Sequence, residues 1–82
     1  MEKIYYVYVL ISINFDKSYI GFTNNLERRL KEHNRGKSKY TRIYKPWEII
    51  YFEKFETREE AREREKYFKS AAGRKFLKNK IW

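Results

Sequence analysis

The sequence contains no cysteine, only one proline and three glycines, and no long run of apolar residues. Without cysteine, neither a disulfide framework nor a thiolate metal site can form, which is typical of proteins in a reducing cytoplasm. No apolar stretch approaches the length that spans a membrane, and no basic segment followed by a small-residue cleavage site marks the start. We therefore expect a cytoplasmic protein without membrane segments, whose fold depends on packing.

Acidic residues are scarce relative to basic ones. The 82 residues include 20 Lys and Arg against 11 Asp and Glu, which gives a net charge of +9. This excess favours a polyanionic partner, with nucleic acid ahead of a membrane surface. The length corresponds to one small domain, residues 1–82, in which any site must lie near the surface.

Three segments have the composition of β-strands. Residues 4–13 are apolar and β-branched, and after turn residues at 14–17 the segment 18–22 is expected to pair back as a second strand. Alternation places the even-numbered tyrosines of the first strand on one face and its valines on the other. A third strand is predicted over residues 47–55.

Two helices are predicted from their capping residues. Asn24, with Glu27 three residues later, opens the first helix, and Gly36 ends it. The capping box Thr57–Glu60 opens the second helix, which we expect to run to about residue 72, where Gly73 breaks it. A short basic tail follows at residues 74–82, either helical or not, from which Phe76 and Leu77 could pack on the sheet. The order of elements predicts an α+β fold, a small three-stranded antiparallel sheet flanked by helices.

Glu65 lies on the face of the second helix that Ala61 and Phe68 predict to be buried. A carboxylate there costs free energy unless it is paired or binds a cation. Glu65 is therefore either the partner of one of the arginines of this helix or a metal ligand.

Four further residues have two interpretations each. Arg29 and His33 are four residues apart on one helix face, where they form either a solvated basic edge or part of a site. Tyr8 and Tyr19 are typical strand tyrosines, but in a hairpin both hydroxyls approach one face near the start of the first helix.

In order and spacing, these residues resemble the GIY-YIG nuclease superfamily, in particular its small stand-alone members. "YVY" at residues 6–8 stands at the position of the first tripeptide, and "YIG" at residues 19–21 is the second, with the motif tyrosines 11 residues apart. Thr23, "NLERRL", His33 and "TREEAREREKYFK", with Glu65 at the metal-ligand position, follow in order. The resemblance extends over nearly the whole chain.

The resemblance implies a metal-dependent endonuclease that hydrolyses DNA phosphodiester bonds, structure-selectively or with weak sequence specificity, in repair or recombination. Glu65 would hold one Mg²⁺ or Mn²⁺ ion. Tyr8 and Tyr19 would position and deprotonate the attacking water, which requires at least one phenol with a pKa well below about 10. Arg29 would stabilise charge on the phosphate, and His33 would orient a tyrosine or bind phosphate.

The basic stretch between the first helix and the third strand is predicted to be an exposed loop that follows the nucleic-acid backbone. Residues 28–45 contain eight Lys and Arg against one Glu. Gly21 would let the substrate approach the backbone closely, and Tyr40 and Tyr44 would stack on bases. The predicted nucleic-acid-binding residues are Gly21, Arg28, Lys31, Arg35, Lys37, Lys39, Tyr40, Arg42 and Lys45.

Two departures from the family pattern leave other functions open. Tyr6 and Val7 replace the Gly and Ile of the first tripeptide, and Phe22 stands where several nucleases have a polar or basic residue. Phenylalanine cannot donate a hydrogen bond to phosphate, which favours a nucleic-acid-binding module with little or no turnover. A protein-interaction domain is the third alternative. For a nuclease, the substrate would be chosen by DNA shape or through an unidentified protein partner.

Overall fold

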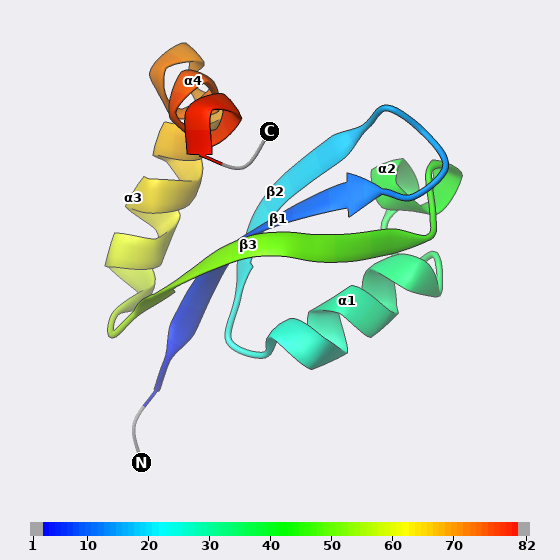
Figure 1. Cartoon of the computed structure of the whole chain (residues 1–82). Coiled ribbons are helices and arrows are strands. Elements are labelled where there is room, and N and C mark those ends of the chain that lie inside the picture. Colours follow the sequence, from blue (N-terminus) through cyan, green and yellow to red (C-terminus); the bar gives the residue numbers. More distant parts are fainter. Residues whose placement is uncertain (1–2, 81–82) are drawn as a thin grey trace.

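The computed structural model describes residues 3–80 and confirms the predicted α+β class, with an unexpected short helix at residues 39–43 and a helix in the C-terminal tail (Figure 1). The strands are β1 (Tyr5–Ser12), β2 (Ser18–Thr23) and β3 (Trp47–Phe55). The helices are α1 (Leu26–Asn34), α2 (Lys39–Ile43), α3 (Arg58–Lys69) and α4 (Ala71–Lys80). Within the described residues, no helix is long and apolar enough to cross a bilayer.

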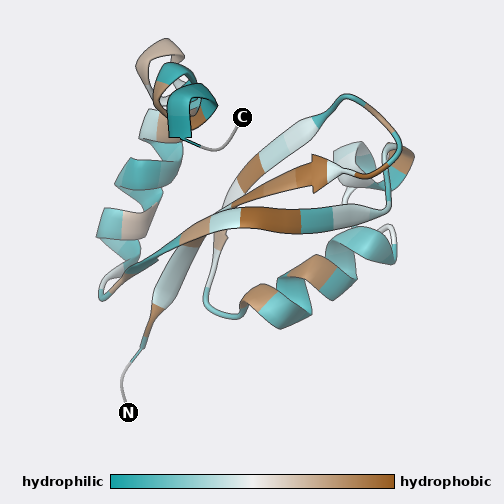
Figure 2. Cartoon of the chain, in the orientation of Figure 1, coloured by the Kyte–Doolittle hydropathy of each residue, from teal (hydrophilic) through white to brown (hydrophobic). Residues whose placement is uncertain are grey.

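The sheet has the strand order β2-β1-β3, and β1 pairs antiparallel with both neighbours. Helices α1 and α2 lie on one face of the sheet, which we call the α1 face, and α3 and α4 lie on the other, the α3 face (Figure 1). Because both faces of β1 are covered, this strand is apolar along most of its length. Figure 2 shows the hydrophobic colours in the middle of the sheet and mostly hydrophilic helices around it.

The core consists of two clusters, one on each face, as the alternation in β1 predicts. On the α3 face, Val7 and Val9 pack in one buried cluster with Phe68 of α3 and Leu77 of α4. On the α1 face, the buried cluster contains Tyr8, Leu10 and Trp47. Tyr8 is only 2% exposed, so the tyrosine side of the sheet is buried at its centre, while Tyr6 is half-buried.

The helix caps follow the predicted chemistry, with one correction. Thr57 caps α3, because its hydroxyl accepts a hydrogen bond from the Glu60 amide at 3.2 Å. The cap of α1 is Asn25 and not Asn24, because Asn25 has extended backbone and its Oδ1 accepts from the Arg28 amide at 3.0 Å. The β2 strand runs one residue further than expected, which moves the helix start by the same amount.

Two other expectations about local structure are wrong. The predicted loop after α1 contains the short helix α2, in which Thr41 is fully buried. Helix α3 ends at Lys69, and Gly73 lies inside α4 instead of breaking a helix. A Cβ atom at Gly73 would overlap the carbonyl oxygen of Tyr67, so this glycine allows α4 to pack closely across the end of α3.

Candidate active site

Tyr8 occupies the centre of the α1 face, directly across the strand pair from Gly21. A Cβ atom at Gly21 would lie 2.6 Å from the Tyr8 hydroxyl and 3.0 Å from Cε2 of Tyr19. Any larger residue would force these rings to move. The second motif glycine therefore makes room for a tyrosine side chain, whereas the sequence predicted that it admits the substrate.

A chain of hydrogen bonds connects Tyr8 to helix α2. The Tyr8 hydroxyl lies 2.9 Å from Nε2 of His33, and Nδ1 of His33 lies 2.8 Å from the Thr41 hydroxyl. The indole Nε1 of Trp47 donates to the Thr41 carbonyl at 2.7 Å, which fixes α2 against the start of β3. His33 and Thr41 are both 0% exposed. His33 is thus placed to orient a tyrosine, the first of its two predicted roles, and has no exposed surface for phosphate.

Burial controls the charge of this pair. It lowers the pKa of His33 to about 4, with the positive charge of Arg29 as the second cause, so the imidazole is neutral at pH 7. Burial also raises the pKa of Tyr8 to about 12, against the lowering effect of the Arg29 guanidinium. The expectation of a phenol with a depressed pKa is therefore wrong for Tyr8, because desolvation outweighs the nearby positive charge.

A neutral imidazole has one donor and one acceptor nitrogen. One tautomer accepts from the Tyr8 hydroxyl and donates to Thr41, and the other donates to Tyr8 and accepts from Thr41. In either arrangement both imidazole nitrogens have a hydrogen-bond partner.

Tyr19 and Arg29 complete the cluster around Tyr8. The ring of Tyr19 is half-buried, with its centroid 4.9 Å from that of His33 and 6.3 Å from that of Tyr8. Arg29 donates to Glu32 at 2.9 Å. Although partial burial opposes it, this hydrogen bond and the contact with Tyr8 hold the pKa of Arg29 above its usual range. A permanent positive charge therefore stands beside the two phenols.

Glu65 approaches this cluster from the opposite helix pair. Its side chain is 19% exposed, and Lys69 donates to its Oε2 at 3.2 Å, so its partner is a lysine and not one of the predicted arginines. The Lys69 ammonium also lies 6.0 Å from the ring centroid of Tyr19. The negative charge of Glu65 contributes to the raised pKa of Tyr8, which places the carboxylate within electrostatic reach of the tyrosine.

Few side chains near the tyrosines could bind a metal ion. No group of three His, Cys, Asp or Glu side chains gathers anywhere in residues 3–80. A single carboxylate such as Glu65 fits a Mg²⁺ ion that takes its other ligands from water and substrate phosphate, because magnesium is commonly bound by one or two carboxylates. It does not fit an all-protein metal cage.

The predicted nucleic-acid-binding residues are distributed unevenly. Arg28 and Lys31 form ion pairs along α1, to Glu32 at 3.9 Å and Glu27 at 3.7 Å, and lie outside the tyrosine cluster. Tyr40 is 43% exposed, and its ring centroid lies 6.2 Å from that of Tyr19, so it borders the cluster. The remaining predicted basic residues are exposed: Arg35, Lys37, Lys39, Arg42 and Lys45.

Phe22 points away from the tyrosines. It packs against the buried cluster of the α3 face, and the Arg58 guanidinium lies 5.8 Å from its ring centroid. Its departure from the family pattern therefore changes packing beneath α3 and does not alter the surroundings of the two phenols.

The sequence did not indicate Thr41 or Lys69 as site residues. Thr41 has no local signal, since its neighbours Tyr40 and Arg42 belong to an exposed basic stretch and its contacts with His33 and Trp47 are tertiary. Lys69 was identifiable in principle, because it lies four residues after Glu65 on one helix.

The antiparallel three-stranded sheet of this small α+β domain thus holds two phenols, an imidazole and a guanidinium together, with the Glu65 carboxylate on α3 within electrostatic reach of Tyr8. The GIY-YIG catalytic domain matches residues 4–79, and the chain belongs to this family. GIY-YIG nucleases are generally dependent on a divalent metal, and the family indicates a nucleic-acid substrate.

Similar proteins support the same assignment. The chain is 49% identical over 65 residues to UPF0213 protein CPE1444 of Clostridium perfringens, covering 78% of this chain and 69% of that protein. It is 38% identical over 76 residues to UPF0213 protein YazA of Bacillus subtilis, covering 92% and 77%. The solution NMR structure of UPF0213 protein BH0048 from Bacillus halodurans is similar with a TM-score of 0.55 at 33% identity, over 93% of this chain and 83% of that one.

Proposed function

We propose that this protein is a metal-dependent endonuclease that hydrolyses phosphodiester bonds in DNA. The observation that carries the proposal is the buried Tyr8–His33 hydrogen bond beside Tyr19 and Arg29. Burying an imidazole and a phenol on a small sheet costs stability unless the pair is fully bonded, and a core of apolar residues would avoid the cost. A role in proton transfer accounts for this arrangement.

Tyr19 and Tyr8 take different parts in the proposed reaction. Tyr19 is the more exposed of the two, and it would contact the attacking water. Tyr8 would accept the proton of that water while its own proton passes to Nε2 of His33, which leaves a hydroxide for the attack and a His33 imidazolium whose Nδ1–H donates to Thr41. This coupled transfer avoids a free Tyr8 phenolate, which a pKa of about 12 disfavours.

Substrate binding would favour this transfer. A phosphate held by Arg29 would raise the proton affinity of the nearby His33 imidazole through its negative charge and by offsetting the positive charge of Arg29, against the effect of burial. Arg29 would hold the phosphate and stabilise the charge that develops on its oxygens in the transition state. A single Mg²⁺ or Mn²⁺ ion bound to Glu65 would supply Lewis-acid stabilisation of the phosphoryl oxygens.

The described residues also bear on how the protein would select its DNA target. Without a groove-reading element among the described residues, we propose that the protein recognises DNA shape or is directed by a protein partner, in DNA repair or recombination. A cytoplasmic location remains a prediction from composition.

The proposal is tested with nicked, branched and single-stranded DNA in Mg²⁺ or Mn²⁺. Glu65→Gln should lower the cleavage rate by on the order of 10³-fold, because metal coordination contributes several kcal/mol to the transition state. Glu63→Gln is the matched control, since Glu63 is exposed two residues away on the same helix, and it should cleave like the wild type. Cleavage that survives Glu65→Gln contradicts the assignment of the metal ligand.

A nucleic-acid-binding module without turnover is the second candidate. The Lys69 ammonium lies 3.2 Å from the carboxylate that would hold the metal, and it competes with a cation for that oxygen. Salt-sensitive DNA binding by a wild-type protein that cuts none of the substrates would favour this function over the first.

A further inference from the structure

A cleft borders the tyrosine cluster on the side away from α1. Its volume is about 690 Å³, and it lies between the β1–β2 turn, α2, the end of α3 and helix α4. Tyr19 and Tyr40 line it on the side of the candidate site. The basic side chains that line it are Lys17, Lys69, Arg74 and Lys78.

The charge in this cleft is unbalanced. Its nine lining residues include four cations and one carboxylate, that of Asp16. Arg74 and Lys78 are exposed, lie four residues apart on α4, and make no ion pair within residues 3–80. Side chains at this spacing share one helix face, so both cations are available to an anion in the cleft.

The wall opposite α4 is fixed in place. The Tyr40 hydroxyl donates to the Ser18 carbonyl at 3.4 Å, which ties α2 to the β1–β2 hairpin. The Tyr40 ring packs against Tyr44 with a centroid distance of 5.3 Å, and its exposed part faces the cleft. An aromatic wall opposite two cations suits a sugar–phosphate backbone with its bases alongside.

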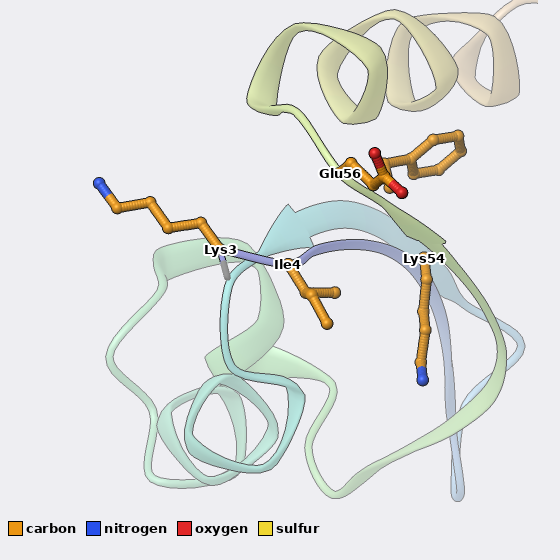
Figure 3. Close-up of a pocket in the computed structure, with 5 residues that line it drawn as sticks. Lys3, Ile4, Lys54 and Glu56 are labelled. Atoms are coloured by element: carbon orange, nitrogen blue, oxygen red, sulfur yellow. The ribbon is translucent and has the colours of Figure 1, made fainter. Parts of the chain in front are cut away.

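A second hollow of comparable size provides a comparison, because it also contains lysines but does not border the tyrosines. It has a volume of about 520 Å³ and lies at the other end of the sheet, lined by Lys3, Ile4, Lys54, Phe55 and Glu56. Figure 3 shows Lys3 and Lys54 extending in different directions from the chain. Its charges neither converge nor border the tyrosines, so it carries no comparable anion site.

We propose that the cleft between α4 and the β1–β2 hairpin binds the sugar–phosphate backbone of the nucleic-acid strand that runs past Tyr19, with Arg74 and Lys78 contacting phosphates. This inference rests on the proposed function in taking nucleic acid as the partner. It adds α4 to the binding surface, whereas the sequence placed the backbone contacts on the stretch from Arg35 to Lys45.

The test measures DNA binding in EDTA, where no metal-dependent cleavage takes place. The double variant Arg74→Gln/Lys78→Gln should lower the slope of log K against log salt by about 1.4 to 1.8, as expected for two lost phosphate contacts. Its affinity should fall about tenfold or more at ~0.1 M salt. Arg74→Lys, which keeps the charge, should retain the wild-type slope.

The matched control is Lys54→Gln/Lys75→Gln, which removes the same charge from exposed positions outside the cleft, one of them on α4. An equal loss of slope in this control, or an unchanged slope in the Arg74/Lys78 variant, overturns the cleft assignment. Because the measurement needs no turnover, a wild-type protein that binds but does not cut refutes the proposed activity and leaves this test valid.

Discussion

The two faces of the sheet differ in chemistry although the central strand β1 supplies both. Toward α3 and α4 it presents Val7 and Val9, which pack with apolar side chains such as Phe68. Toward α1 and α2 it presents Tyr8, whose hydroxyl is hydrogen-bonded to His33 in a region without solvent. Apolar packing is sufficient to explain the first face, but the second buries polar groups that a stable core does not need.

The polar groups of the α3 face lie at its margin. The Arg64 guanidinium donates to Glu53 at 2.8 Å, with both side chains more than a fifth exposed. It also lies 4.6 Å from the ring centroid of Phe68 and 5.1 Å from that of Phe76. The Arg64–Glu53 ion pair lies at the solvent-exposed edge of the α3-face core, whereas the Tyr8–His33 hydrogen bond lies inside the α1-face core. The contrast associates the buried core of the α3 face with stability and the buried core of the α1 face with function.

Truncation on the α3 face should have the largest effect on folding. Phe68→Ala removes a fully buried ring and should lower the free energy of unfolding by about 3–5 kcal/mol, measured by urea denaturation. Phe52→Ala, at a 46% exposed position of β3, is the control and should cost about 1 kcal/mol or less. Equal losses would mean that the α3 cluster is not the main source of stability.

Acid should destabilise the α1 face through its imidazole. The native histidine stays neutral down to about pH 4, whereas in the unfolded chain it binds a proton near pH 6.5. Between these values the unfolded state binds more protons, so the free energy of unfolding falls as the pH falls, by up to about 3 kcal/mol.

His33 is the only histidine of the chain, so its imidazole resonances are unambiguous in an NMR titration. We expect an inflection near pH 4. An inflection near pH 6.5 in the folded protein would show that the imidazole is solvated, which contradicts the buried hydrogen-bond chain.

A smaller effect is expected at the end of this chain. Thr41→Val keeps the shape but leaves Nδ1 of His33 without a partner, which should cost about 1–3 kcal/mol of stability. The nitrogen chemical shifts of the imidazole should then report a changed tautomer balance. Thr23→Val removes another buried hydroxyl, which contacts Asn25 and not His33, and it should leave those shifts unchanged. Identical shifts in both variants would exclude Thr41 from positioning His33.

Much of the fold could be predicted because its signals are local. Strand β3 has the predicted bounds, and the Thr57 cap is correct, since alternation and capping boxes depend on near neighbours in the sequence. The predictions are wrong where contacts between residues far apart in the sequence determine the local structure. Gly73 fits α4 against the Tyr67 carbonyl, and α2, at five residues, is too short to show helical periodicity.

In the candidate site, too, local features could be predicted from the sequence and features set by tertiary contacts could not. Its residue types were predictable from motif and spacing, but the environment of each was not. Burial raises the pKa of Tyr8, although at least one of the two phenols was expected to have a lowered pKa, and it hides His33. Neither effect is visible before the strands and helices are packed. Lys69 was overlooked because the helix offered many arginines as partners for Glu65.

The most direct test removes one tyrosine hydroxyl from each face and compares DNA cleavage. Tyr8→Phe breaks the bond to His33, and Tyr51→Phe breaks the bond from Tyr51 to Glu53 on the α3 face. With Mg²⁺ or Mn²⁺ present, Tyr8→Phe should cleave about 10²- to 10⁴-fold more slowly than the wild type, while Tyr51→Phe stays within about twofold. Equal rates in the two variants would contradict the assignment of catalysis to the α1 face.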